Sequence, residues 1–142
     1  MSLTNAQYNF IMKGYEQTRD RNRHLYEQRR LEVYAKLPEY QKLDESIGEL
    51  SVAQARLLLN GDDEALTRLR SSLKEISLQK KELLRSAGYP LDYLEPIYDC
   101  PDCRDTGYVE TEDNLHKKCH CFHQQELNIL YEQSHIREMI AS

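Results

Sequence analysis

The sequence lacks tryptophan and holds few residues that interrupt regular structure, with five glycines and four prolines among 142 residues. No apolar run approaches the roughly 18 residues that a membrane-spanning helix needs, so we expect a soluble protein without membrane contact. The N-terminus has neither the basic nor the apolar stretch of a secretory signal, which predicts a cytoplasmic location. The phosphate-binding pattern G-x-x-x-x-G-K-S/T is also absent, so we do not expect this chain to be an ATPase or another enzyme.

The first 88 residues are rich in glutamate, leucine, arginine, lysine and glutamine, a composition that predicts helices. Thr4 and Gln7 can form a capping box at the start of a long first helix that runs to Leu37. Pro38 ends this helix and suits the first turn of the next one.

Two further helices are predicted to form an antiparallel hairpin around a turn at Asn60-Gly61-Asp62. The third helix has a heptad pattern in which Lys80 alone interrupts an apolar stripe. The stripe consists of Leu66, Leu69, Leu73, Ile76, Leu83 and Ala87. Residues 1–88 are therefore expected to form a helical region, as a hairpin or as a three-helix assembly with the first helix packed alongside.

Residues 89–123 are predicted to form a small module of a different kind. Tyr108–Thr111 and Leu115–Lys118 are short runs with β propensity, separated by a turn. Residues 124–142 return to a helical spacing of apolar positions. The predicted fold class is mainly α-helical: a long helical hairpin or three-helix assembly, followed by a small zinc-ribbon-like β-hairpin and a C-terminal helix.

All four cysteines of the chain fall within 22 residues, as C-P-D-C followed by K-C-H-C. They are Cys100, Cys103, Cys119 and Cys121. Two close pairs on a segment that can fold back bring four thiolates to the corners of one tetrahedron, which is the arrangement of a structural zinc site. Because four cysteines leave no position open for water, we expect one structural Zn²⁺ and no hydrolytic chemistry. The segment is too short to bury a useful core, so zinc binding is expected to fold it.

Nearby histidines keep other ligand sets open. The C-x-C spacing of Cys119 and Cys121 is tighter than the C-x-x-C spacing of the first pair, so a histidine is a candidate substitute for one of these two thiolates. The candidates are His123, which has the best spacing, and His120 and His116. Two metal-free alternatives are a disulfide framework and a redox-active dithiol formed by Cys100 and Cys103.

Charge is segregated by element within an overall net charge of −5. The first and third predicted helices are mainly basic, and the second is mainly acidic. The ordinary explanation is pairing between helices together with solvated faces. The alternative is a nucleic-acid or acidic-partner face on the first helix, where tyrosines lie between the arginines. The arginines of this face are Arg19, Arg21, Arg23, Arg29 and Arg30.

The cysteine module has the opposite charge. The segment from Tyr89 to Asn114 carries eight carboxylates and one arginine. This charge would repel phosphate, so the module is expected to bind a protein rather than a nucleic acid. Any binding of single-stranded DNA would depend on the basic helices, and we expect it to be weak.

Three stretches of the chain carry a resemblance to a known family. They are GYPLDYLEPIYDCPDCRDTGYV from Gly88 to Val109, KCHCF from Lys118 to Phe122, and LYEQSHI from Leu130 to Ile136. The chain resembles the N-terminal region of DnaC/DnaI-type bacterial replicative helicase loaders of the Firmicute kind. In that family a helical, zinc-containing N-terminal domain precedes an AAA+ ATPase module. The resemblance covers nearly the whole chain and is specific around the cysteines.

The resemblance implies a function. It implies a helicase-binding adaptor that docks on a hexameric DnaB-type helicase during replication initiation in the primosome, with zinc held by the four cysteines. Some loaders of this group use a histidine ligand, which keeps the three histidines as candidates. The AAA+ module is missing from this chain, and self-association remains open. The alternative function is a zinc-containing nucleic-acid-binding protein that acts through the basic helices.

Overall fold

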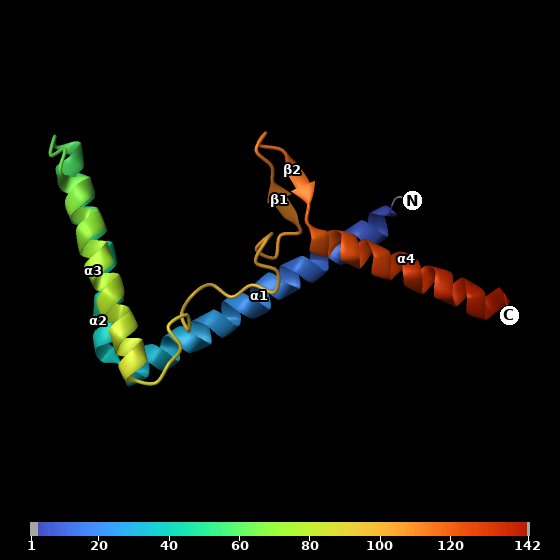
Figure 1. Cartoon of the computed structure of the whole chain (residues 1–142), viewed down its shortest axis with the longest axis horizontal. Coiled ribbons are helices and arrows are strands. Elements are labelled where there is room, and N and C mark those ends of the chain that lie inside the picture. The colour runs from blue at the N-terminus through green and yellow to red at the C-terminus, as the bar shows by residue number, and fades with distance from the viewer. Residues whose placement is uncertain (1–2, 142) are drawn as a thin grey trace. The chain divides into compact units, whose positions relative to one another are not determined.

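The protein is described by a computed structural model that covers residues 3–141, with side chains described up to residue 134. In chain order it contains α1 (Asn5–Lys36), α2 (Pro38–Leu59), α3 (Ala65–Ser86), β1 (Tyr108–Glu110), β2 (His116–Lys118) and α4 (His120–Ala141) (Figure 1). The predicted mainly helical fold with a small β-hairpin is confirmed. Among the described residues, no helix is both long and apolar enough to cross a membrane.

The chain forms two compact units, and α1 contributes to both. One unit combines the chain up to Leu25 with the chain from Pro96 onward. The other unit runs from Tyr26 to Glu95. We call them the cysteine unit and the hairpin unit and describe each by itself.

The hairpin unit contains α2 and α3, which pair as the sequence predicts. Gly61 ends α2 with a φ of 98°, a value that suits glycine because it has no Cβ. There the Asp62 N–H donates to the Leu57 carbonyl oxygen at 3.0 Å, and the Gly61 N–H donates to that of Leu58 at 3.1 Å. These bonds satisfy carbonyl groups that a helix end would otherwise leave without donors.

The hairpin unit has a small core of aromatic and aliphatic side chains. Val33, Tyr40 and Leu84 are buried there, one from each of α1, α2 and α3. Lys80, which interrupts the heptad stripe, forms an ion pair with Asp44 at 2.5 Å and lies 5.1 Å from the centre of the Tyr40 ring. The lysine therefore has both an anion and an aromatic face within the hairpin, which explains why it is tolerated in an apolar stripe.

The cysteine unit begins with the capping box that the sequence predicts. The Thr4 N–H donates to Gln7 Oε1 at 2.9 Å, and the Gln7 N–H donates to Thr4 Oγ1 at 3.1 Å. From this start α1 contributes Ile11 and Tyr15 to a buried cluster with Phe122 of α4 and the cysteines. The N-terminal half of α1 thus forms part of the core around the cysteines.

The β-hairpin of this unit is antiparallel, with Val109 of β1 opposite Lys117 of β2. The Cys119 N–H donates to the Gly107 carbonyl oxygen at 2.8 Å and extends the pairing by one step beyond the strands. The next residue, His120, already belongs to α4. Helix α4 therefore begins inside the segment 89–123, and Cys121 lies in its first turn.

Candidate metal centre

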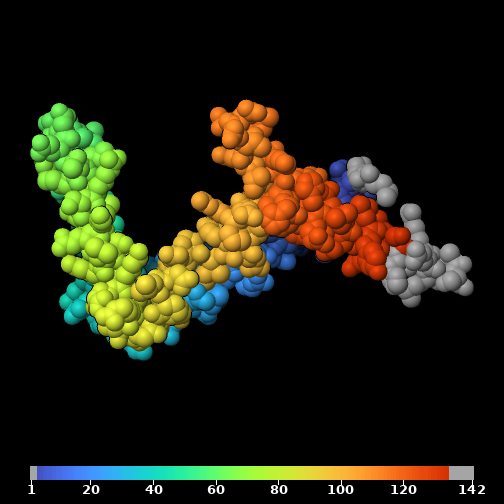
Figure 2. Space-filling model, in the orientation of Figure 1, coloured from blue at the N-terminus to red at the C-terminus, as the bar shows by residue number. Residues whose placement is uncertain are grey.

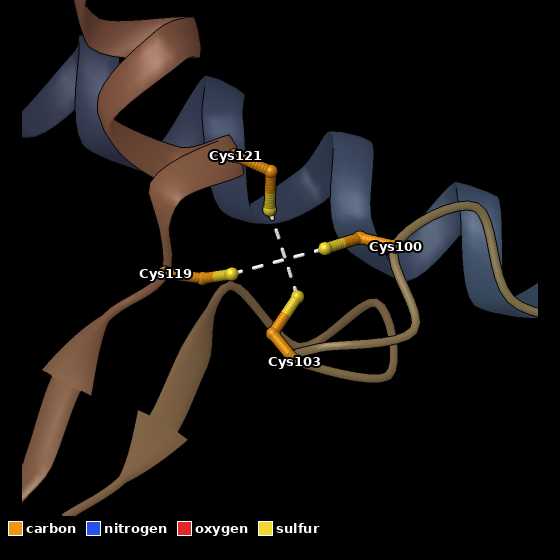
Figure 3. A group of neighbouring side chains, drawn as sticks. All are labelled: Cys100, Cys103, Cys119 and Cys121. Atoms are coloured by element: carbon orange, nitrogen blue, oxygen red, sulfur yellow. Dashed lines mark hydrogen bonds between the residues drawn. The ribbon is translucent and has the colours of Figure 1, made fainter.

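The four cysteine side chains converge on one point, as Figure 3 shows. All four Sγ atoms lie within 4.8 Å of one another. The Sγ atoms of Cys100 and Cys119 are 3.8 Å apart, and those of Cys103 and Cys121 are 3.6 Å apart. The sequence predicted this grouping from the spacing of the two pairs.

These distances fit a metal ion better than disulfide bonds. A tetrahedral ion with metal–sulfur bonds of about 2.3 Å places its sulfur atoms about 3.8 Å apart. A disulfide needs sulfur atoms about 2.05 Å apart, and all four cysteines are free. The arrangement can therefore hold a metal ion with four sulfur ligands.

The first cysteine pair is shaped by a tight turn after Cys103. Arg104 and Asp105 have φ values of 55° and 60°, in the left-handed region that residues with a Cβ seldom adopt. The Thr106 N–H donates to the Cys103 carbonyl oxygen at 3.2 Å, which closes the turn. Backbone strain of this kind persists only where surrounding contacts determine it.

Asp105 supplies those contacts. Its side chain is almost fully buried, with 2% exposed. Oδ1 accepts the Cys100 N–H at 2.8 Å, while Oδ2 accepts the Asp99 N–H at 3.0 Å and Asn22 Nδ2 at 3.0 Å. Three donors thus satisfy a buried carboxylate, and the two backbone donors fix the chain next to the first cysteine.

Helix α1 contributes polar side chains that tie it to this turn. Asn22, 6% exposed, also donates to Asp99 Oδ1 at 3.0 Å, and Arg19 donates to the Asp105 carbonyl oxygen at 2.8 Å. Arg21 pairs with Asp99 at 2.6 Å. The bonds from Asn22 and Arg21 hold the pKa of the Asp99 carboxyl below its usual range. The acidic turn therefore has its counter-groups on α1.

The second cysteine pair lies at the start of α4, which explains its tight spacing. Cys119 immediately precedes the helix, and its carbonyl oxygen accepts the Phe122 N–H at 2.9 Å. Against the effect of burial, the backbone N–H of Cys121 acts to lower the pKa of the Cys119 thiol. Cys119 thus acts as a cap of the helix while Cys121 points from its first turn, and both sulfur atoms benefit from the positive end of the helix dipole.

The ionisation of the thiols indicates a need for a cation. Burial raises the pKa of the Cys119 thiol. Burial, together with the three neighbouring thiols, raises the pKa of Cys121 to about 12. Cys119 and Cys121 therefore resist becoming thiolates, whereas hydrogen bonds, acting against burial, lower the pKa of the Cys103 thiol. A bound cation would favour the thiolate form and release protons.

The three histidines occupy different positions. His120 Nε2 lies 2.7 Å from Asp102 Oδ2 and 3.8 Å from Cys100 Sγ, so it forms a second group of metal-ligand type with these two residues. Asp102 raises the pKa of this imidazole. His123 Nδ1 lies 3.1 Å from Glu126 Oε1. His116 is exposed on β2, and neither it nor His123 belongs to a ligand group among the described residues.

Tyr15 contacts the cysteine cluster directly. Its hydroxyl oxygen lies 2.9 Å from Cys121 Sγ, and its ring stacks on Phe122 with centroids 6.1 Å apart. Gly107 makes room for this ring, because a Cβ there would lie 2.8 Å from Tyr15 Cε2. The φ of Gly107 is also positive, at 85°, so glycine is required on two grounds.

Sequence reasoning did not identify Tyr15, Asn22 or Asp105 as parts of the site. A signal was present, because Tyr8, Ile11, Tyr15 and Asn22 recur at three, four and seven positions along one face of α1. The polar asparagine on that face obscured the stripe.

The five arginines proposed as a partner-binding face all have partners within the chain. Arg19 donates to the Asp105 carbonyl oxygen, Arg21 pairs with Asp99, Arg23 pairs with Asp20, Arg29 donates to the Tyr93 carbonyl oxygen, and Arg30 pairs with Glu27. Of the tyrosines between them, Tyr15 is buried and Tyr26 and Tyr34 are partly buried. These contacts favour a structural role for the face.

Comparisons with family models, with curated proteins and with solved structures found no significant match to the chain. The resemblance to helicase loaders therefore stays a prediction, and the geometry of the cysteines is the firmest guide to function.

Proposed function

We propose that the four cysteines hold one structural zinc ion and that the chain is the helicase-binding N-terminal domain of a replicative helicase loader. The proposal of a metal site rests on one observation: the sulfur atoms of four free cysteines all lie within 4.8 Å of one another. A tetrahedral set of four thiolates suits zinc among the metals common in proteins. Cys100, Cys103, Cys119 and Cys121 would then fill its coordination shell.

A closed shell supports an adaptor rather than an enzyme. A catalytic zinc needs a coordination position for water or substrate, and four cysteines leave none. The ion would supply folding free energy instead, of the order of ~10–16 kcal/mol in small zinc modules. It would fix the turn at Asp105, the β-hairpin and the start of α4 as one surface.

The charge of that surface supports a protein partner. The loop between β1 and β2 exposes Glu112 and Asp113, and Glu110 and Leu115 beside it are also exposed. Leu115 is 64% exposed. Figure 2 shows this end of the β-hairpin, in orange, projecting from the rest of its unit. Carboxylates around an apolar side chain suit a basic protein surface and repel phosphate.

The choice of a DnaB-type hexameric helicase as that partner rests on the family resemblance alone. The alternative of a nucleic-acid-binding protein is less well supported, because all five arginines of the proposed face on α1 have partners within the chain. We expect at most weak, strongly salt-dependent binding of single-stranded DNA.

The metal is tested by native mass spectrometry of the full chain, with elemental analysis of the same sample. We expect one zinc per chain, held through gel filtration. Protein that carries no metal and forms a Cys100–Cys103 disulfide reversibly would refute the zinc site and favour the redox alternative.

The partner is tested by gel filtration of the zinc-loaded chain with a hexameric DnaB-type helicase from a Firmicute. Co-elution is expected with Glu112 intact and weakened in Glu112→Lys, which reverses the charge of the hairpin loop. Glu49→Lys is the matched control, because Glu49 is also an exposed glutamate and lies on α2. Tight DNA binding that is lost in Arg19→Ala and Arg23→Ala, without helicase co-elution, would favour the nucleic-acid alternative.

A further inference from the structure

We infer that Tyr15 is a positioning residue of the metal centre, whose hydroxyl group donates a hydrogen bond to Cys121 Sγ and holds that sulfur in the coordination shell. The inference rests on the proposed metal site and concerns a residue outside its ligand set. The two groups lie 106 positions apart in the sequence and 2.9 Å apart in space.

The direction of the hydroxyl group follows from how tightly the ring is held. Tyr15 is 5% exposed, and its ring is stacked on Phe122 at an interplanar angle of 16°. On another side the ring abuts the backbone of Gly107, where no Cβ could be accommodated. A ring fixed in this way presents its hydroxyl group to Cys121 without losing further side-chain entropy.

Cys121 differs from the other three cysteines in its exposure. It is partly exposed, whereas Cys100, Cys103 and Cys119 are buried. Nearby backbone N–H groups lower the pKa of two of the other thiols against the effect of burial, that of Cys121 acting on Cys119 and that of Gly107 on Cys103. Four thiolates around a divalent ion leave a net negative charge, and donors to the sulfur atoms disperse it. Tyr15 supplies this donor at Cys121 from a side chain of α1.

The consequence is a link between α1 and metal retention. Residues that hydrogen-bond to metal ligands typically change metal affinity by about 10–100-fold when they are removed. Loss of the Tyr15 hydroxyl group should therefore weaken retention of the ion while the four sulfur ligands remain.

The test compares Tyr15→Phe with Tyr8→Phe in the full chain loaded with cobalt(II). Tyr8 is a matched control, because it lies on the same helix with its ring 6.0 Å from Phe122. Its hydroxyl oxygen lies 2.9 Å from that of Tyr108 and not beside a sulfur atom. We expect only Tyr15→Phe to shift the sulfur-to-cobalt charge-transfer band to lower energy, because an unbonded thiolate gives up its electrons more readily.

The same proteins are then mixed with excess chelator. Tyr15→Phe should lose cobalt about tenfold faster than the wild type, and Tyr8→Phe should match the wild type. Equal rates and equal spectra for both variants would overturn the role of Tyr15. Equal acceleration in both variants would overturn it as well, because it would point to packing of the aromatic rings. Failure of the wild-type chain to bind cobalt would instead overturn the metal site, and this inference with it.

A measurement on the wild type decides the matter if Tyr15→Phe does not fold. In cadmium-loaded protein, the Tyr15 hydroxyl proton should be protected from exchange and visible by NMR close to the β protons of Cys121. A Tyr15 hydroxyl proton that exchanges freely with water would overturn the inference.

Discussion

The two units of the molecule are stabilised in different ways. The buried side chains of the cysteine unit include three thiols, one carboxylate and one amide alongside Ile11, Tyr15 and Phe122. Those of the hairpin unit are Val33, Tyr40, Ala65 and Leu84. The cysteine unit buries thiols that can bind a cation and a carboxylate that needs hydrogen-bond donors, whereas the hairpin unit buries mainly apolar surface.

The two units therefore differ in the interactions that stabilise them. The hairpin unit satisfies the C-terminal ends of α2 and α3 with backbone bonds, as at Gly61, and pairs its one lysine in the heptad stripe with Asp44. The cysteine unit satisfies the buried carboxylate of Asp105 internally, but its four sulfur atoms form a group that could hold a metal ion. Dependence on metal should therefore be local.

Removal of the metal tests this difference between the units most directly, and we expect it to have the largest effect on stability. A strong chelator should abolish amide protection from Cys100 to Phe122, because about 10–16 kcal/mol of apparent stabilisation is lost in small zinc modules. Protection in α2 and α3 should remain. Hydrogen exchange read by mass spectrometry measures both regions in one sample.

Re-addition of zinc serves as the control and should restore protection. Equal loss of protection in α2 and α3 would contradict the local dependence on metal.

Asp105 tests whether the polar contacts of the cysteine unit matter beyond the metal. Asp105→Ala removes the acceptor of the Cys100 and Asp99 N–H groups and one of the two acceptors of the Asn22 amide, at a cost of about 1–3 kcal/mol for each buried group left unpaired. We expect a loss of several kcal/mol in thermal unfolding of the zinc-loaded protein. Asp105→Asn keeps one acceptor oxygen and should lose less.

The matched control for that experiment is Asp113→Ala, because Asp113 is an exposed aspartate of the same module. It should change stability by less than about 0.5 kcal/mol. Equal melting temperatures for Asp105→Ala and Asp113→Ala would show that the buried carboxylate is dispensable.

Much of the fold was predictable because its signals are local. The capping box at Thr4 and the turn at Gly61 each depend on residues a few positions apart, and the structure confirms them. The heptad stripe of α3 predicted the helix, but its fully buried residues are Ala65 and Leu84, outside the stripe, and Leu66 is exposed. The grouping of the cysteines was predictable as well, because the chemistry of thiolates leaves few uses for two close pairs.

The parts that could not be predicted depend on contacts between distant segments. The bond from Tyr15 to Cys121 and that from Asn22 to Asp105 span 106 and 83 positions, and a single sequence carries no record of such pairs. The same limit applies to Arg19. Its charge suggests a contact with a nucleic acid or an acidic partner, but in the structure it donates to the Asp105 carbonyl oxygen. The start of α4 at His120 was missed because a cysteine is an unusual helix cap.

Lys80 and Asp44 provide a smaller test, in the hairpin unit. Asp44 accepts hydrogen bonds from Lys80 and from the Tyr34 hydroxyl group, the latter at 2.5 Å, and both charged side chains are about four-fifths buried, at 22–23% exposure. Asp44→Ala should destabilise α2 and α3 by about 2–4 kcal/mol, because it leaves the Lys80 ammonium without its anion. Chemical denaturation followed by helical circular dichroism measures the change.

The double variant Asp44→Leu/Lys80→Leu completes the apolar stripe and should recover most of that loss, since a buried ion pair is often replaceable by apolar residues. If the double variant is less stable than Asp44→Ala, apolar residues cannot replace the ion pair at this place. Either result leaves the metal content of the cysteine unit unchanged if the two units are independent.

Alkaline pH should have the smallest effect on the hairpin unit. Burial, with the hydrogen bond to Asp44, raises the pKa of Tyr34 to about 12, and burial raises the pKa of Tyr40 to about 12. In the unfolded chain both tyrosines titrate near pH ~10, so between these values the folded state holds more protons than the unfolded state. The stability of α2 and α3 should therefore be constant below pH ~10 and fall as the pH rises from ~10 towards 12. Tyr34→Phe removes one of the two titrating groups, so its denaturation midpoint should fall less steeply over this range than that of the wild type. A slope unchanged by Tyr34→Phe would mean that the tyrosine hydroxyl group does not link the hairpin to pH.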